Sequence, residues 1–154
     1  ADRIGADRSD VYLLGLLHSI GRVVINELLH VNDVEVFWDR FVPIGQWETA
    51  MVGFTGEVAG SLLLKNWNFS AAIYERLANQ SRKESIAGDR VLVLLHYAKQ
   101  LALHLDDAER FEALCDPAGH LYLRKFCRSR DRLIRDIAEA RATVAAVHES
   151  LKEN

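Results

Sequence analysis

Apolar residues along this 154-residue chain recur every three or four positions, which is the spacing of amphipathic α-helices. The first such run predicts one continuous helix from Ser9, a favourable N-cap, to about Val31. Its apolar residues cover more than half of the circumference, so the helix is predicted to be largely buried. Gly15 and Gly21 lie inside it, and each interior glycine costs about 1 kcal/mol relative to alanine. Both glycines therefore predict points where another part of the chain comes close.

Shorter helical patterns follow, and each is bounded by residues that begin or end helices. Pro43 and Gly53 end two of them, and Thr55 and Ser70 are N-caps of the next two. The polar residues 80–88 are predicted to form a loop. Helices are predicted at about 34–41, 44–52, 56–67, 71–79, 89–105 and 107–114. Pro117 and Gly119 separate them from a last helical region that runs almost to the end of the chain.

No segment alternates convincingly between apolar and polar residues with the period of two that strands show. Nine glycines and two prolines are few for a turn-rich β-sandwich. With 49% apolar and 27% charged residues, the composition is that of an ordinary globular domain, which excludes a disordered tail, a disulfide scaffold and a fibrous repeat. The fold class predicted is all-α, with seven or eight helices.

Charge and cysteine content limit the partners and the cellular compartment expected for the chain. Nineteen basic and 22 acidic residues give a net charge of −3, which points to neither nucleic acid nor a membrane as partner. No apolar stretch reaches the roughly 18 residues of a membrane span, and no signal peptide is visible. Cys115 and Cys127 are too few for a disulfide framework, so a reduced, cytoplasmic chain is expected. Because the chain begins with Ala1 rather than methionine, we expect a piece of a longer protein.

One motif carries a family resemblance. The segment Gly15-Leu16-Leu17-His18-Ser19-Ile20-Gly21 resembles the Gly-Leu-Leu-His-Asp-Ile-Gly helix of the HD superfamily, above all in its HDOD branch, the HD-related output domain of bacterial signalling proteins. The resemblance covers about residues 10–105. It implies a compact multi-helix bundle, and the helices that usually precede this motif are absent. Further matching residues are Glu48, Gly53-Phe54-Thr55, Glu57-Val58-Ala59-Gly60, Leu63, Trp67 and 92–103.

HD enzymes hold a divalent metal with His and Asp side chains, and the metal activates water for attack on a phosphate ester. The resemblance places positions of that site at His18, Ser19, Gly56 and Lys99, and Asn79-Gln80 stands where relatives often carry paired histidines. Only His18 keeps a ligand, because Ser19 replaces an aspartate, Gly56 often a histidine, and Lys99 the final aspartate. A hydroxyl is a poor ligand, glycine has none, and a lysine repels a cation.

These positions are therefore interpreted as vestigial. No catalytic residue, no metal and no other cofactor is predicted. His18 is interpreted as a core histidine that is hydrogen-bonded to a neighbour. The other histidines are scattered; His96 and His104, for example, lie two helical turns apart, about 11 Å along the axis.

Three other features leave alternatives open. The aromatic residues between 38 and 69 are interpreted as wedges between short helices, with a ligand pocket or partner surface as the alternative. The basic residues of 124–135 are interpreted as a solvated face, with phosphate binding as the alternative. A heptad-like seam near the C-terminus is expected to pack on its own domain or on a second chain. Its candidate interaction residues are Leu133, Ile137, Val144, Val147 and Leu151, with Ala140 between them.

Together these observations predict an HDOD-like domain over residues 9–117, truncated at its N-terminus, and a C-terminal helical segment over 118–154 that packs on it or on a partner. The function predicted is a non-catalytic signalling module that contacts a protein partner or another domain of the same protein. A homodimer is an alternative, whereas nucleic acid and membrane are not expected as partners. The rival functions are a metal-dependent HD-type phosphohydrolase with atypical ligands and phosphate or nucleic-acid binding. Apolar surface on the first helix is expected to need a cover from outside residues 1–154.

Overall fold

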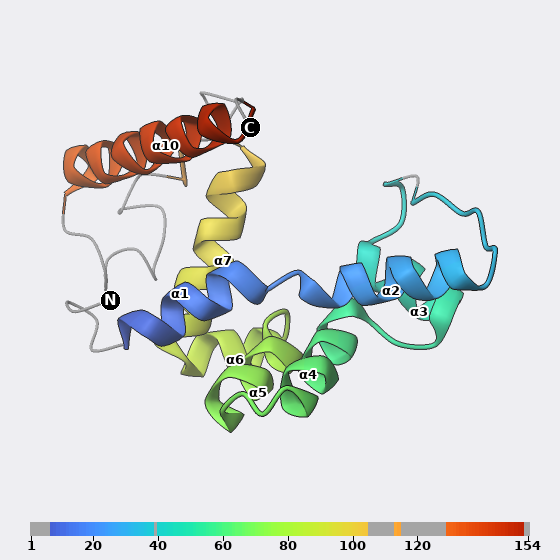
Figure 1. Cartoon of the computed structure of the whole chain (residues 1–154). Helices are drawn as coiled ribbons and strands as arrows, with labels where there is room; N and C mark the ends of the chain where they lie inside the picture. Colours follow the sequence, from blue (N-terminus) through green and yellow to red (C-terminus); the bar gives the residue numbers. More distant parts are fainter. Residues whose placement is uncertain (1–6, 39, 105–112, 115–128, 153–154) are drawn as a thin grey trace. The chain divides into compact units, whose positions relative to one another are not determined.

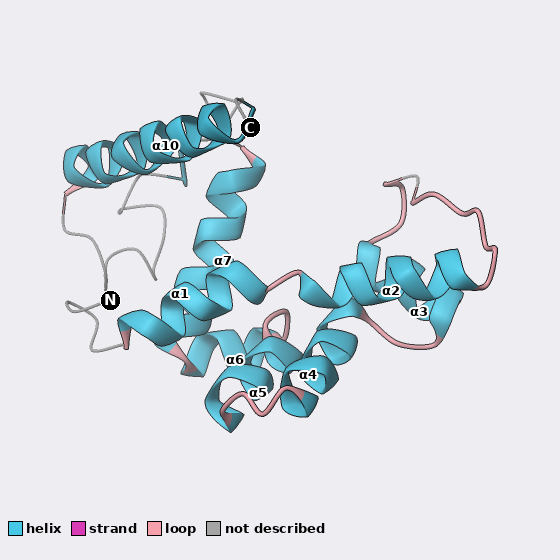
Figure 2. Cartoon of the chain, viewed as in Figure 1, coloured by secondary structure: helices cyan, strands magenta, loops and turns pink. Residues whose placement is uncertain are grey.

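The computed structural model describes residues 7–38, 40–104, 113–114 and 129–152 (Figure 1). Among these described residues there are eight helices and no strand, which confirms the all-α prediction (Figure 2). The chain divides into two compact units, Ala1–Tyr97 and Ala98–Asn154, and each is described by itself. The predicted boundary between residues 117 and 118 lies outside the described residues and stays a prediction.

The first predicted helix is interrupted. It forms α1 (Arg8–Leu17) and α2 (Ile20–Val31), separated by two residues. Asp7 rather than Ser9 is the N-cap of α1, because its carboxylate accepts hydrogen bonds from the backbone N–H groups of Ser9 and Asp10. The prediction of one continuous helix is therefore wrong. A periodic pattern shows which positions share a face, but a break at one residue preserves that pattern.

The prediction that this region is largely buried is also wrong. In α1 only Leu14 is buried, and in α2 the buried residues are Gly21, Ile25 and Leu29. Apolarity of a face does not show whether other helices reach it. The large apolar side chains that α1 and α2 leave exposed are Tyr12, Leu16, Val23, Leu28 and Val31.

The segment between α2 and α3 contains no helix among its described residues, so the helix predicted at 34–41 is wrong. Asp33 and Arg40 have positive φ angles of 54° and 69°, which helices do not contain. The indole Nε1 of Trp38 donates to the carbonyl oxygen of Val42 at 2.7 Å. β-Branched and aromatic residues lose side-chain freedom in a helix, which favours this irregular path.

The next helices follow the sequence closely. In α3 (Ile44–Val52) the C-cap is Gly53, whose φ of 83° suits glycine. The Thr55 hydroxyl accepts a hydrogen bond from the backbone of α4 (Gly56–Asn66), and Ser70 is the N-cap of α5 (Ala71–Asn79). By contrast, α6 (Lys83–Gly88) forms where a loop was predicted, and its Ile86 is buried. Burial of one apolar side chain stabilises a turn of helix here, although the mostly polar local sequence predicts none.

The core of the first unit lies around α4, which contacts α2 on one side and α5 on the other. Ile25, Leu29 and Ala59 form a buried cluster, and Trp47 and Phe54 pack against it. The interpretation of aromatic residues as wedges holds for these two. The start of α7 (Arg90–Leu103) adds further buried residues, and the most buried large side chains of the unit are Leu14, Leu64, Ile73 and Leu77.

In the second unit, α10 (Arg130–Lys152) confirms a long helix near the C-terminus. Leu133 and Ile137 of the predicted seam are half-buried and Ala140 is exposed. The side chains of Val144, Val147 and Leu151 lie outside the description, so the packing of the seam stays a prediction. The described residues also exclude Cys115, Cys127, residues 124–128 and most of the helix predicted at 107–114.

One observation concerns membranes. Taken as one run, Arg8–Val31 is long and apolar enough to cross a bilayer by length and composition, with a mean hydropathy of 1.3 over an 18-residue window that is 17% buried. This corrects the expectation that no stretch reaches that length. Core helices and signal sequences meet the same criterion, so the finding assigns no membrane to this chain.

Candidate functional site

His18 lies at the junction between α1 and α2, where it is the C-cap of α1 and is partly exposed. Its Nδ1 is 2.7 Å from the carbonyl oxygen of Gly15. A carbonyl oxygen only accepts, so Nδ1 carries the proton and donates it. His18 therefore has a hydrogen-bonded neighbour as predicted, although it is not a core residue. Nε2 is the one ring nitrogen left with a lone pair for a ligand.

Gln80 fixes the same junction from the end of α5. Its side-chain Nε2 donates to the carbonyl oxygen of His18 at 2.8 Å, and the residue is 3% exposed. A helix end leaves carbonyl groups without partners in the helix, and a buried amide supplies one here. No local sequence pattern predicts this contact, because 62 residues separate its two partners.

Gly56, which the resemblance places at another position of the HD metal site, takes part in close backbone packing between α2 and α4. A Cβ atom added at Gly21 would lie 1.7 Å from the carbonyl oxygen of Gly56 and 2.6 Å from the backbone nitrogen of Gly60. This confirms the close approach predicted at Gly21. The same prediction is wrong for Gly15, where an added Cβ would meet nothing within 4 Å.

Glu48 is the buried carboxylate beside Gly56, and it is 4% exposed. Its Oε2 accepts the backbone N–H of Gly56 at 2.8 Å, and its Oε1 lies 3.5 Å from Nε of Arg22. The N–H of Gly56 belongs to the first turn of α4, where helices leave donors without partners. Glu48 thus joins α3 to the start of α4 and faces a cation on α2.

The residues that the resemblance places at the metal site do not fit the divalent metal of HD enzymes. His18 offers one imidazole nitrogen, Ser19 a neutral hydroxyl and Gly56 no side chain, whereas Lys99 lies on the part of α7 that belongs to the second unit. Within residues 7–38, 40–104, 113–114 and 129–152, no three His, Cys, Asp or Glu side chains form a group that could hold a metal ion.

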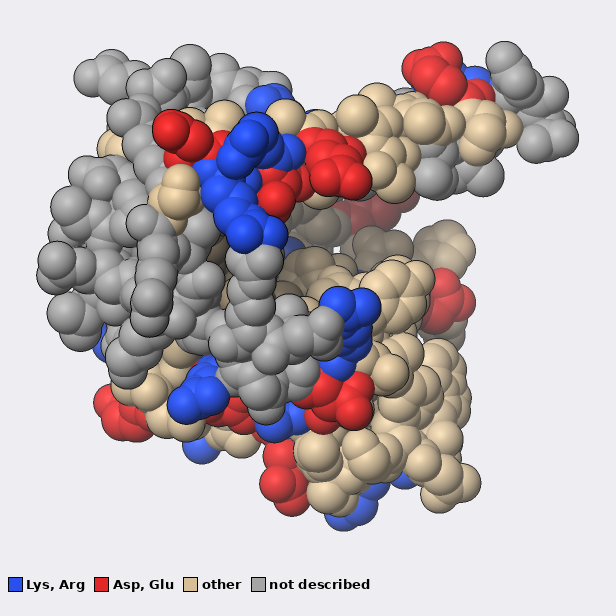
Figure 3. All heavy atoms as spheres, turned by 90° about the vertical axis from the view of Figure 1, so that its left-hand side faces the viewer, with Lys and Arg blue, Asp and Glu red and all other residues tan. Residues whose placement is uncertain are grey.

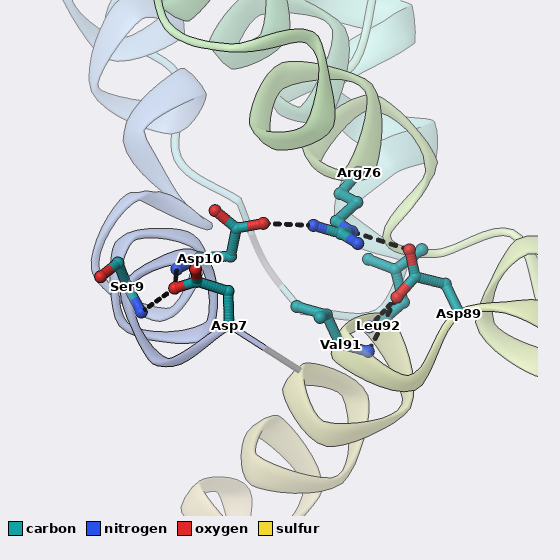
Figure 4. A network of polar contacts seen from close by, with 7 residues as sticks. All are labelled: Asp7, Ser9, Asp10, Arg76, Asp89, Val91 and Leu92. Carbon is teal, nitrogen blue, oxygen red and sulfur yellow. Dashed lines mark hydrogen bonds and ion pairs between the residues drawn. The ribbon is translucent and has the colours of Figure 1, made fainter. Parts of the chain in front are cut away.

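A second polar network, which sequence reasoning missed, joins α1, α5 and the start of α7. Arg76 lies between two carboxylates: its Nη1 is 2.8 Å from Oδ2 of Asp10, and its Nε is 2.7 Å from Oδ2 of Asp89 (Figure 4). The other oxygen of Asp89 accepts the backbone N–H groups of Val91 and Leu92. Because Asp10 and Arg76 are 66 residues apart, no local pattern reveals their pairing.

The three charged side chains of this network are 25–30% exposed, so their mutual attraction is screened less than on an open surface. Burial alone would raise the pKa of Asp89, but the hydrogen bond from Arg76, the backbone N–H groups and the arginine charge outweigh burial and lower that pKa. Burial likewise opposes the charge of Arg76, and its two carboxylate partners nevertheless raise its pKa. Both groups are therefore held in their charged forms.

An open hollow of about 380 Å³ lies beside this network. Arg76 and Asp89 line it, but both already bind each other, so they form a structural contact between helices. The remaining lining residues are Ala72, Glu75, Asn79, Ser85 and Leu92.

Among the described residues at the start of α10, basic and acidic side chains are mixed. Arg132 and Arg135, the described side chains of the predicted basic stripe, are exposed on α10, and so are the nearby Asp131 and Asp136. On the face drawn in Figure 3, blue and red side chains of the described residues lie side by side. The interpretation as a solvated face stays a prediction for residues 124–128.

The described residues form helices only, as expected from the resemblance to HD-related domains, and His18 lies at the α1–α2 junction. A model of the HDOD domain family matches residues 1–83, more than half of the chain, so the chain belongs to the HDOD domain family, which is associated with signalling. His18, Ser19 and Gly56 lie within the matched residues, and Lys99 lies beyond them. Neither the curated proteins nor the solved structures gave a significant match.

Proposed function

We propose that this HDOD domain is a non-catalytic regulatory module of a cytoplasmic bacterial signalling protein, and that it acts through protein contacts. The observation that carries the proposal is the packing at Gly56. Where many relatives have a histidine, the backbone of α4 lies against Gly21 of α2. The contact that holds two helices together thus stands in the place of a metal ligand.

The surroundings of Gly56 support the same proposal. A Cβ atom at this residue would lie 3.1 Å from Oε1 of Glu48, 3.2 Å from Cγ of Arg22 and 3.4 Å from the backbone nitrogen of Arg22. These separations are tight, so a larger side chain would require its neighbours to move. Glu48 itself already binds a backbone N–H group and faces a guanidinium. The carboxylate of Glu48 and the backbone at Gly56 are therefore engaged in hydrogen bonding and packing between helices.

Exposed apolar residues support a role in protein contacts. Phe37 and Phe41, in the segment between α2 and α3, are 91% and 90% exposed. Aromatic side chains contribute much of the binding energy at protein interfaces, and folded monomers rarely expose them to this extent. In the sequence, residues 23–39 carry four acidic residues and no lysine or arginine. A partner with an apolar surface and basic residues around it would complement this segment.

The experiment is a metal and activity measurement on the purified chain. The chain is incubated with Mn²⁺, and unbound metal is removed. Bound metal is then measured, and phosphodiesterase activity is assayed with bis(p-nitrophenyl) phosphate as substrate. His18→Ala is the test variant. His30→Ala is the matched control, because His30 is an exposed histidine on α2. We expect less than one metal ion per chain and no turnover in all three proteins.

Stoichiometric Mn²⁺ with turnover that His18→Ala abolishes and His30→Ala retains would falsify the proposal. It would instead establish the metal-dependent phosphohydrolase with atypical ligands. Affinity for nucleic acid that falls steeply with salt concentration would favour the third function, binding through residues 124–135.

A further inference from the structure

Local sequence and structure disagree at one residue of the α1–α2 junction. The apolar periodicity predicts a continuous helix, and His18 has helical dihedral angles of φ −58° and ψ −22°. Of the two residues between the helices, only Ser19 departs from helical dihedral angles, with φ −113° and ψ 6°. Its side chain makes no capping hydrogen bond to α2. Helical angles at this residue would therefore join α1 and α2 into one helix from Arg8 to Val31 at little local cost.

The contacts of α1 with its own unit are few. Leu14 is its one buried residue, and α5 is the helix that it contacts most. Asp10 binds Arg76 on α5, and Gln80 donates to the carbonyl oxygen of His18 at the junction. We call the face of α5 that carries Arg76 the α1 seat. Because the seat already binds α1 of its own chain, its chemistry fits the identical α1 of a second copy.

A stripe of exposed apolar side chains crosses the junction. Tyr12, Leu16 and Val23 are 69%, 63% and 63% exposed, and they are four and seven residues apart. This spacing places all three on one face of a continuous helix, with Ser19 between them. The stripe is divided by the break in the present structure. It becomes a contiguous apolar face when α1 and α2 are one helix.

We propose that two copies of this domain exchange α1. In the exchanged dimer, Arg8–Val31 is one helix in each copy, α1 of one copy binds the α1 seat of the other, and the two apolar stripes face each other. The contacts of Leu14 and Asp10 are the same in monomer and dimer, so the dimer gains the continuous helix and the buried stripes. Exchange of an identical element is a low-cost route to dimers.

This inference rests on the proposed role in protein contacts, since it names a second copy as a partner. Its test is sedimentation of the 154-residue chain over a range of concentrations. Ser19→Ala favours the continuous helix, and Ser19→Gly is its matched control that disfavours it. Alanine and glycine differ by about a factor of five in helix propensity, so two junctions per dimer predict an association constant about 25-fold larger for Ser19→Ala.

Three further arms test the exchanged dimer. Leu16→Glu should abolish the dimer and leave the monomer folded, because Leu16 is exposed there. Asp10→Asn should lower the stability of monomer and dimer alike, and so leave the association constant unchanged. Mixing Asp10→Arg with Arg76→Asp restores opposite charges at both seats of an exchanged pair, so heterodimers should form in the mixture in preference to homodimers of either variant.

A wild-type chain and a Ser19→Ala variant that both remain monomeric would overturn the inference. So would equal association of the Ser19→Ala and Ser19→Gly variants, or loss of the dimer in Asp10→Asn. Binding of the Tyr12, Leu16 and Val23 stripe to vesicles or to another protein, without self-association, would also count against it. None of these results affects the proposed function, which the metal and activity measurement tests independently.

Discussion

The α2–α4 junction and α1 are held by different kinds of contact, although one motif from Gly15 to Gly21 contributes to both. At the junction, Gly21 lets two backbones approach within contact distance, and Ile25 and Leu29 continue the packing. Helix α1 buries a single leucine, and it is otherwise held by one ion pair and by the hydrogen bond of Gln80 to its C-terminal end at the α1–α2 junction. The comparison teaches that two glycines of one motif can differ in role: packing requires Gly21, whereas Gly15 lies where an added Cβ atom meets nothing within 4 Å.

The largest effect is expected at Gly21. In Gly21→Ala the added Cβ would overlap the backbone of α4, which cannot move as a flexible side chain can. We expect a loss of about 3 kcal/mol or more in the free energy of unfolding, which would lower the melting temperature by about 10 °C. Gly15→Ala is the matched control: its Cβ meets open space, and it should stabilise the helix by up to about 1 kcal/mol. Equal melting temperatures for the two variants would refute the difference between the regions.

Arg76→Met probes the attachment of α1. It leaves Asp10 and Asp89 without their cation while both carboxylates are about 70% buried, which we expect to cost about 2 kcal/mol. Lys152→Met is the control, because Lys152 and Glu149 form an ion pair whose side chains are 57% and 70% exposed. Such a surface pair contributes about 0–1 kcal/mol. Urea unfolding of the two variants measures the difference, and a similar loss in both would mean that the Arg76 network adds nothing beyond a surface contact.

Glu48 tests the polar part of the α2–α4 junction. Glu48→Ala leaves the backbone N–H of Gly56 buried without an acceptor, which we expect to cost about 1–2 kcal/mol. Glu48→Gln keeps a side-chain oxygen that can accept this hydrogen bond, so it should cost less than half as much. Thermal unfolding distinguishes them. If glutamine destabilises as much as alanine, the charge of Glu48 toward Arg22 matters more than the hydrogen bond.

The sequence predicted the all-α fold and the caps of α3, α4 and α5, because these depend on residues near one another in the chain. It predicted the close contact at Gly21 because a glycine inside a helix is costly unless another part of the chain needs the space. It missed Gln80 and the Arg76 network, whose partners are 62 and 66 residues apart. It also missed the break at Ser19, because a change in one residue's dihedral angles leaves the apolar period intact. The exposure of α1 was not predicted for a related reason, because an apolar pattern does not show whether other helices pack against the apolar face.

The smallest effect is a pH dependence of stability from Asp89. Its pKa is lowered in the folded chain from an ordinary value of 3.8, so its contribution is present above that value and is lost as the pH falls through the lower folded pKa. Asp89→Asn keeps an oxygen for the backbone N–H groups and does not titrate. The excess stability of the wild type over this variant should therefore shrink below about pH 4 in urea unfolding. A difference that stays constant down to pH 2 would contradict the assignment.

Hydrogen exchange of backbone amides tests the central claim most directly, because it reads both regions in one experiment. We expect amides in the last turns of α1, at residues 13–17, to exchange through local opening, at least about tenfold faster than the buried amides of α2 and α4. Asp10→Asn should accelerate exchange in α1 and leave α4 unchanged. Equal protection of α1 and α4, or acceleration of both in Asp10→Asn, would contradict the account of a firmly packed junction and a lightly attached α1.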